Sequence, residues 1–114
     1  MKIAAVCGSF HKEEIQRMLE YAENEANNNG AQITKIIWVP GSMDVPLALD
    51  RQLKDSEVDA AIALGIIERG ETQHGLVMGQ AVTRYVIELQ IKYDKSIGLG
   101  IIGPGAENIT LNQD

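Results

Sequence analysis

The chain has 114 residues, enough for one domain with a hydrophobic core, and 45% of them are hydrophobic, which is typical of globular proteins. The net charge of −6 argues against nucleic-acid binding, because that function needs a basic surface. No apolar run approaches the roughly 20 residues of a membrane span, and the single cysteine, Cys7, cannot form an internal disulfide. Since no secretion signal is recognisable, we expect a cytoplasmic protein.

Apolar runs typical of buried strands alternate along the chain with segments in which apolar residues recur every three or four positions, as in helices. Glycine and proline punctuate the segments, and Asn-Asn-Asn-Gly after the first helix is a strong stop signal. We expect Ser9 to cap the first helix, and Asp44 or Ser42 to cap the second, with Pro46 in its first turn. In chain order, the expected elements are a strand (3–7), a helix (13–28), a strand (33–39), a helix (47–53), a strand (60–65), a helix (73–92) and a strand (97–102).

This order predicts one α/β domain over residues 1–114, a three-layer α/β/α fold with a four-stranded parallel, flavodoxin-like sheet. A further helix after Gly105 would cover the last strand in the usual way. The chain ends at Asp114, so we expect that C-terminal helix to be missing.

Functional residues are expected at one edge of the sheet. The loops after all four strands leave from the carboxyl ends, where parallel sheets bind ligands. Residues 65–74 lead from a strand into a helix N-terminus, which favours anions. His74, the last of them, is expected about one turn into that helix. Taken alone, His74 could be a surface histidine, Asp44 a helix cap, and Phe10 or Trp38 part of the core. A site is favoured because residues 10–11, 40–44 and 66–74 and Leu99 all follow strands and are therefore expected at the same edge.

Three segments carry a resemblance to a known family. Residues 38–48, which contain Val-Pro-Gly-Ser-Met-Asp-Val-Pro, resemble the strand-to-helix loop of lumazine synthases. Residues 59–74, which end in Arg-Gly-Glu-Thr-Gln-His, resemble the most diagnostic segment of that family, and residues 100–105 are similar to its archaeal branch. The resemblance covers nearly the whole chain in order.

The resemblance implies an enzyme of riboflavin biosynthesis. Lumazine synthases condense 5-amino-6-ribitylaminouracil with 3,4-dihydroxy-2-butanone 4-phosphate to 6,7-dimethyl-8-ribityllumazine. The family uses no metal and no cofactor. The resemblance also implies a homo-oligomer built on pentamers, with active sites between subunits.

The same resemblance assigns roles to residues. His74 would transfer protons during Schiff-base formation and phosphate elimination. Phe10 would stack on the pyrimidine ring. The other expected contacts are Ser42, Met43 and Asp44 with the ribityl chain, the backbone of Ile66, Ile67 and Glu68 with the ring, Glu71 and Thr72 with the phosphate through backbone N–H groups, and Leu99 with the ring site of a neighbouring subunit.

Two departures from the family pattern keep alternatives open. His11 stands where the family has an asparagine-like residue, and no arginine follows Arg84, although the family binds phosphate through a C-terminal arginine. The missing arginine alone supports one alternative, a catalytically weak ligand-binding or shell-forming homologue. The other is an archaeal-type riboflavin synthase, which shares the fold but lacks the Arg-Gly-Glu-Thr-x-His segment.

Overall fold

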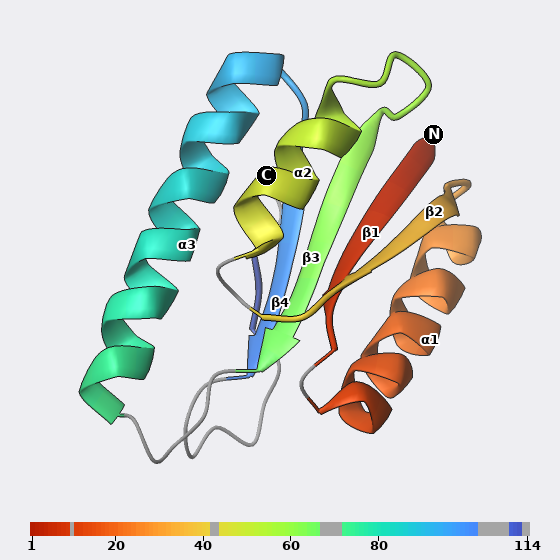
Figure 1. The fold of residues 1–114 in the computed structure, drawn as a ribbon. Coiled ribbons are helices and arrows are strands. Elements are labelled where there is room, and N and C mark those ends of the chain that lie inside the picture. Colours follow the sequence, from red (N-terminus) through yellow and green to blue (C-terminus); the bar gives the residue numbers. More distant parts are fainter. Residues whose placement is uncertain (10, 42–43, 67–71, 103–109, 113–114) are drawn as a thin grey trace.

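The computed structural model describes the backbone of residues 1–9, 11–41, 44–66, 72–102 and 110–112, and the side chains of residues 1–9, 11–41, 44–65 and 83–100. Strands and helices alternate through most of the chain, as expected (Figure 1). The elements are β1 (Lys2–Gly8), α1 (Lys12–Asn28), β2 (Gln32–Val39), α2 (Val45–Leu53), β3 (Ala60–Ile66), α3 (Thr72–Tyr93), β4 (Ile97–Ile102) and β5 (Thr110–Asn112).

The sheet has the strand order β2-β1-β3-β4-β5. Strands β1 to β4 are parallel, which confirms the predicted α/β fold with a four-stranded parallel, flavodoxin-like core. The short strand β5 was not predicted, and it pairs antiparallel with β4, where Leu99 lies opposite Asn112. Three residues, Thr-Leu-Asn, are too few to show the alternation that identifies a strand in a sequence.

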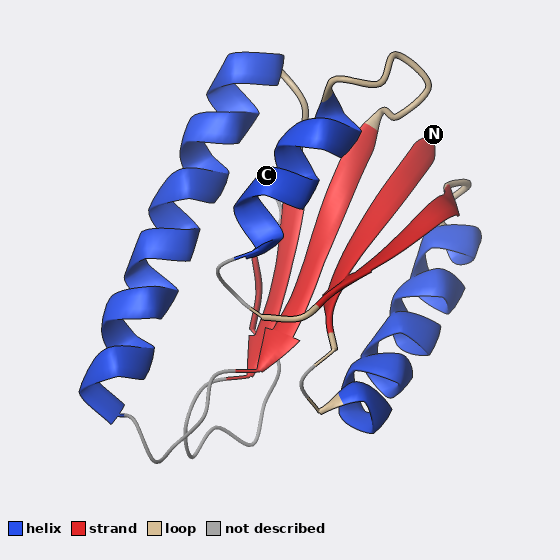
Figure 2. Ribbon diagram, viewed as in Figure 1, coloured by secondary structure: helices blue, strands red, loops and turns tan. Residues whose placement is uncertain are grey.

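The three helices divide between the two faces of the sheet, with α2 and α3 on one face and α1 on the other (Figure 2). Each helix meets the sheet through the apolar stripe that its sequence predicts. In α1 this stripe is Ile15, Met18 and Leu19, at the three- and four-residue spacing of one helical face. These residues pack against Cys7 and Leu64 of the sheet.

The second core cluster fills the space under α2 and α3. Leu49 and Leu53 of α2 and Leu89 of α3 are at most 3% exposed and contact the central strands. Because parallel strands have helices on both faces, these strands read as continuous apolar runs, and that pattern identified them in the sequence.

The start of α1 differs from the prediction. Ser9 does not cap the helix; its backbone N–H donates to the Val39 carbonyl at 2.7 Å and so continues the β1–β2 pairing. The helix begins at Lys12, and the residue at its N-cap position is His11, with φ 65° and ψ 52° and no capping side-chain hydrogen bond. The stop signal after α1 is confirmed, because Gly30 has a φ of 75° that glycine adopts without a steric penalty.

Among the described residues, α1 covers only part of its face of the sheet. A groove of about 770 Å³ lies between α1 and the sheet, and its lining includes Met18, Tyr21, Ile33, Ile62 and Gly98. Within the described segments, no helix is long and apolar enough to cross a membrane.

Candidate functional site

The carboxyl ends of the four parallel strands meet at one edge of the sheet, as the sequence predicted (Figure 1). Gly8 at the end of β1 lies opposite Val39 at the end of β2, and Ile66 at the end of β3 lies opposite Ile102 at the end of β4. We call this edge the rim. The loops that lead into α1, α2 and α3 all start there, so every one of the predicted site loops leaves the sheet on the same side.

Asp44 lies at the rim, directly before α2, with an exposed side chain. It occupies the N-cap position, which confirms one of the two expected cap residues, but its side chain makes no capping hydrogen bond. Instead, the Gly41 backbone N–H donates to Asp44 Oδ2 at 3.1 Å, and the Asp44 N–H donates to the Gly41 carbonyl at 3.0 Å. These two bonds close the turn. A carboxylate accepts several hydrogen bonds, so Asp44 can also accept from ligand hydroxyl groups.

α3 begins at Thr72, which places the backbone of His74 in the first helical turn. This helix follows β3, and Ile66 is the last residue of that strand. The predicted strand-to-helix connection is therefore confirmed at both of its ends. The side chains of Ile66, Thr72 and His74 are outside the described residues.

Several predicted contact residues also lie outside the described residues, namely Phe10, Ser42, Met43, Ile67, Glu68 and Glu71. The described residues that flank them, Ser9, Gly41, Asp44 and Ile66, belong to the rim or its first turns.

The expected position of Leu99 at the rim is wrong, because the residue lies within a strand and does not follow one. It lies in the middle of β4, opposite Ala63 of β3, and its side chain is 8% exposed in the core cluster under α2 and α3. In the single chain, only a small edge of this side chain is accessible to a neighbouring molecule.

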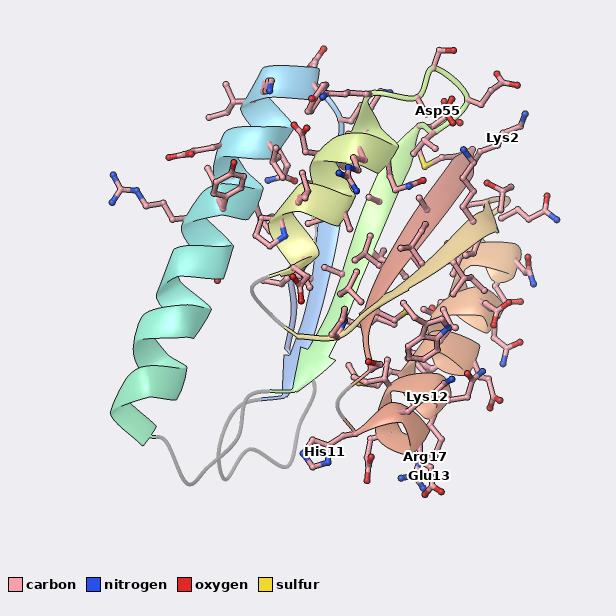
Figure 3. The ribbon with its side chains drawn as sticks, viewed as in Figure 1. Lys2, His11, Lys12, Glu13, Arg17 and Asp55 are labelled. Carbon is pink, nitrogen blue, oxygen red and sulfur yellow. The ribbon has the colours of Figure 1, made fainter. Side chains whose placement is uncertain are left out.

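His11 is a rim residue whose conformation the sequence did not reveal. Its positive φ places it in the left-handed region, where histidine is enriched along with asparagine and aspartate. Figure 3 shows its imidazole beyond the end of β1, pointing away from Lys12, Glu13 and Arg17 of α1. One signal could have predicted this conformation. The family has an asparagine-like residue at this position, and asparagine also adopts the left-handed conformation readily.

Two other residues that stood out in the sequence have structural positions. Trp38 is half-buried in the α1 cluster, and the Lys12 ammonium lies 5.1 Å from the centre of its ring. Cys7 is fully buried, and this burial, with a smaller effect from Glu23, raises the pKa of its thiol to about 11. A thiol with that pKa is protonated at neutral pH and is a poor nucleophile.

A polar cluster joins the two helices on the other face. The Tyr93 hydroxyl at the end of α3 donates to Asp50 Oδ1 of α2 at 2.6 Å. The Lys92 ammonium lies 3.4 Å from the same oxygen, and Lys54 Nζ lies 3.3 Å from Asp50 Oδ2. The Tyr93 hydrogen bond, followed by those from the two lysines, lowers the pKa of Asp50 below its ordinary value.

Among the described side chains, no three or more His, Cys, Asp or Glu residues gather closely enough to hold a metal ion. The described part of the rim contains the Asp44 carboxylate, the His11 imidazole and the start of α3 at Thr72.

Comparison with known proteins gives one consistent result. A family model described as 6,7-dimethyl-8-ribityllumazine synthase matches residues 1–113. A protein of that name from Methanothermobacter thermautotrophicus is 38% identical over 113 residues, which are 99% of this chain and 81% of the relative. Its namesake from Picrophilus torridus is 35% identical over 109 residues, 96% of this chain and 80% of the relative. Another from Archaeoglobus fulgidus is 32% identical over 113 residues, 99% of this chain and 79% of the relative.

Proposed function

This chain belongs to the 6,7-dimethyl-8-ribityllumazine synthase family, and we propose that it condenses 5-amino-6-ribitylaminouracil with 3,4-dihydroxy-2-butanone 4-phosphate. The products are 6,7-dimethyl-8-ribityllumazine, one phosphate and two waters. The observation that carries this proposal is the family match over residues 1–113. The rim, with its three loop-to-helix connections at one edge of the sheet, is where a parallel α/β fold binds small molecules.

The chemistry requires several proton transfers but no external oxidant or reductant. The amine of the pyrimidine attacks the ketone, and the resulting carbinolamine must lose water to form an imine. Phosphate then leaves as a neighbouring carbon loses a proton, and the second amine closes the ring with loss of another water. The proposal therefore includes no redox cofactor.

His74 is the proton-transfer residue in this proposal. An imidazole changes its charge near neutral pH, so it both accepts and donates protons under physiological conditions. Its backbone lies in the first turn of α3, next to the helix N-terminus, where backbone N–H groups favour an anionic phosphate. One residue there can serve both imine formation and phosphate loss.

The remaining roles follow the three rim loops. In the proposal, Phe10 stacks on the pyrimidine ring, and Asp44 accepts hydrogen bonds from ribityl hydroxyls. The exposed carboxylate of Asp44, which Gly41 already fixes, supports this second role. The other proposed contacts are Ser42 and Met43 with the ribityl chain, Ile66, Ile67 and Glu68 with the ring, Glu71 and Thr72 with the phosphate, and the accessible edge of Leu99 with a neighbouring subunit's ring site.

We also propose that the protein assembles as a homo-oligomer built on pentamers, with each site at a subunit boundary. Exposed apolar residues on α3 support self-association: Tyr85 and Ile87 are each 47% exposed, and Ile91 is 77% exposed. Ile87 and Ile91 lie four residues apart and so on one side of the helix. A second copy that covers this side removes apolar surface from water. We place the assembly in the cytoplasm, where a buried free thiol such as Cys7 stays reduced.

Two measurements test these proposals. Purified protein should form the lumazine from both substrates, followed by absorbance, and light scattering should show an oligomer at micromolar concentration. A folded protein without turnover would support the weak-homologue alternative instead. The riboflavin synthase alternative is not favoured, because the three relatives named above are lumazine synthases.

A further inference from the structure

The contact between α2 and α3 combines apolar packing with polar contacts from Tyr93 and Lys92 of α3 to Asp50 of α2. Leu49 and Leu53 of α2 and Val86 and Leu89 of α3 belong to the same core cluster. At the edge of that cluster, the Tyr93 hydroxyl donates to the Asp50 carboxylate at 2.6 Å. The Asp50 side chain is only 17% exposed, so its hydrogen bonds are partly shielded from water.

The two helices joined in this way carry two of the proposed site residues at their starts. Asp44 directly precedes α2, and His74 lies in the first turn of α3. The contact lies six residues after Asp44 on α2, but 19 residues after His74 on α3, which is roughly 28 Å along the α3 axis at 1.5 Å per residue. It therefore acts on the first turn of α3 through the tilt of the whole helix against α2. The Tyr93–Asp50 contact therefore joins the two helices that carry these site residues.

We propose that the hydrogen bond between Tyr93 and Asp50 is a positioning contact for the condensation, because it fixes α2 against α3 and thereby places Asp44 relative to His74. This inference rests on the proposed function. Neither Tyr93 nor Asp50 touches the substrates in this arrangement; each acts through the helix that carries it.

A hydrogen bond constrains this arrangement in a way that apolar packing does not. The hydrophobic effect is non-directional, whereas a hydrogen bond weakens steeply when its angle departs from the preferred range. α2 has nine residues, and Asp50 lies six residues after Asp44, roughly 9 Å along the helix axis at 1.5 Å per residue. Over so short a helix, a displacement at Asp50 reaches Asp44 almost unchanged.

The direct test is Tyr93→Phe, which removes the hydroxyl and keeps the ring that packs against the core cluster. We expect kcat/KM for the ribityl substrate to fall by roughly 3- to 10-fold, because misplacement of a binding group by a fraction of an ångström weakens a reaction that depends on proximity. KM for the butanone phosphate should stay within about twofold, since its proposed contacts lie at the start of α3 itself. Kinetics are measured well below the unfolding midpoint of each variant, so that all of the protein is folded.

Two matched variants separate positioning from general destabilisation. Lys54→Gln removes a partner of Asp50 that lies on α2 itself, and it should leave the kinetics unchanged. Asp50→Asn keeps an oxygen that accepts from Tyr93, whereas Asp50→Ala removes it. Asp50→Asn should therefore retain most of the activity that Asp50→Ala loses.

The outcomes distinguish this inference from the proposed function. If the wild-type protein turns over but folded Tyr93→Phe and Asp50→Ala have wild-type kinetics, the inference is overturned and the proposed function stands. Equal losses in Lys54→Gln and Tyr93→Phe would also overturn it, because destabilisation alone would then explain the effect. A wild-type protein that forms no lumazine would overturn the proposed function itself.

Discussion

The two faces of the sheet are covered in different ways. On one face, α2 and α3 pack side by side over the strands, and a polar contact between Tyr93 and Asp50 joins them. On the other face, α1 stands beside an apolar groove of about 770 Å³. In the proposal, the more completely covered face carries the helices that hold Asp44 and His74. The loop into α1 carries Phe10, so in the proposal both faces contribute residues to the rim.

The largest expected effect is the loss of turnover in His74→Ala, which we compare with His11→Ala on the other face. His74→Ala should lower turnover by about 10²- to 10⁴-fold, the usual contribution of a general acid–base group. His11→Ala, at the start of α1, should have a much smaller effect. Steady-state lumazine formation by both variants provides the comparison, and a slower His11→Ala enzyme with near-normal His74→Ala would reverse the proposed roles.

Core truncations on the two faces should differ in their cost to stability. Leu49→Ala on α2 leaves a cavity between two helices and the sheet, and we expect a loss of about 2–5 kcal/mol in the free energy of unfolding. Met18→Ala on α1 should cost less, because Met18 borders the groove and the side chains there have room to relax. Urea unfolding of both variants measures the difference; a larger loss for Met18→Ala would mean that the groove side is the tighter one.

Phe10→Ala tests whether the α1 side contributes to ring binding. Loss of one stacking partner should weaken the affinity for the lumazine product by about 1–3 kcal/mol. The variant should keep its fold, which circular dichroism verifies. Unchanged affinity in calorimetry would place the ring site away from the loop between β1 and α1.

The smallest expected effect concerns the pH dependence of stability on the α2–α3 face. The Tyr93 hydroxyl and the two lysines lower the pKa of Asp50 below its ordinary value of 3.8. A carboxyl with a lowered folded-state pKa stabilises the fold above its unfolded pKa, and this stabilisation disappears as pH falls through the folded pKa. Asp50→Asn should therefore weaken the acid dependence of the unfolding midpoint as pH falls through 3.8 and below it. The same acid dependence in both proteins would show that Asp50 contributes nothing to it.

Much of the fold could be predicted because parallel strands and amphipathic helices leave clear patterns. Residues 60–65 form an uninterrupted apolar run, and the apolar positions of α1 repeat at helical spacing, so both elements were located within a residue or two. The left-handed conformation of His11 and the short strand β5 left no such pattern. The conformation of His11 and the pairing of β5 depend on local geometry that many different sequences can adopt, so neither could be predicted.

The site was predictable in its location but not in its contacts. Strand ends of a parallel sheet must share one edge, so the rim followed from the order of elements. The hydrogen bond from Gly41 to the Asp44 carboxylate could not be predicted in the same way. A carboxylate that caps a helix and one that closes a turn have the same sequence signal. The Tyr93–Asp50 contact joins residues 43 positions apart, and no local pattern connects them.

The most direct test of the proposed function is the formation of 6,7-dimethyl-8-ribityllumazine by the purified protein. Absorbance is followed with both substrates present and with each one omitted. We predict a saturable rate well above the uncatalysed condensation, which disappears when either substrate is left out. A rate equal to the uncatalysed one, with folded protein and both substrates at millimolar concentration, would contradict the assignment of this chain as a working lumazine synthase.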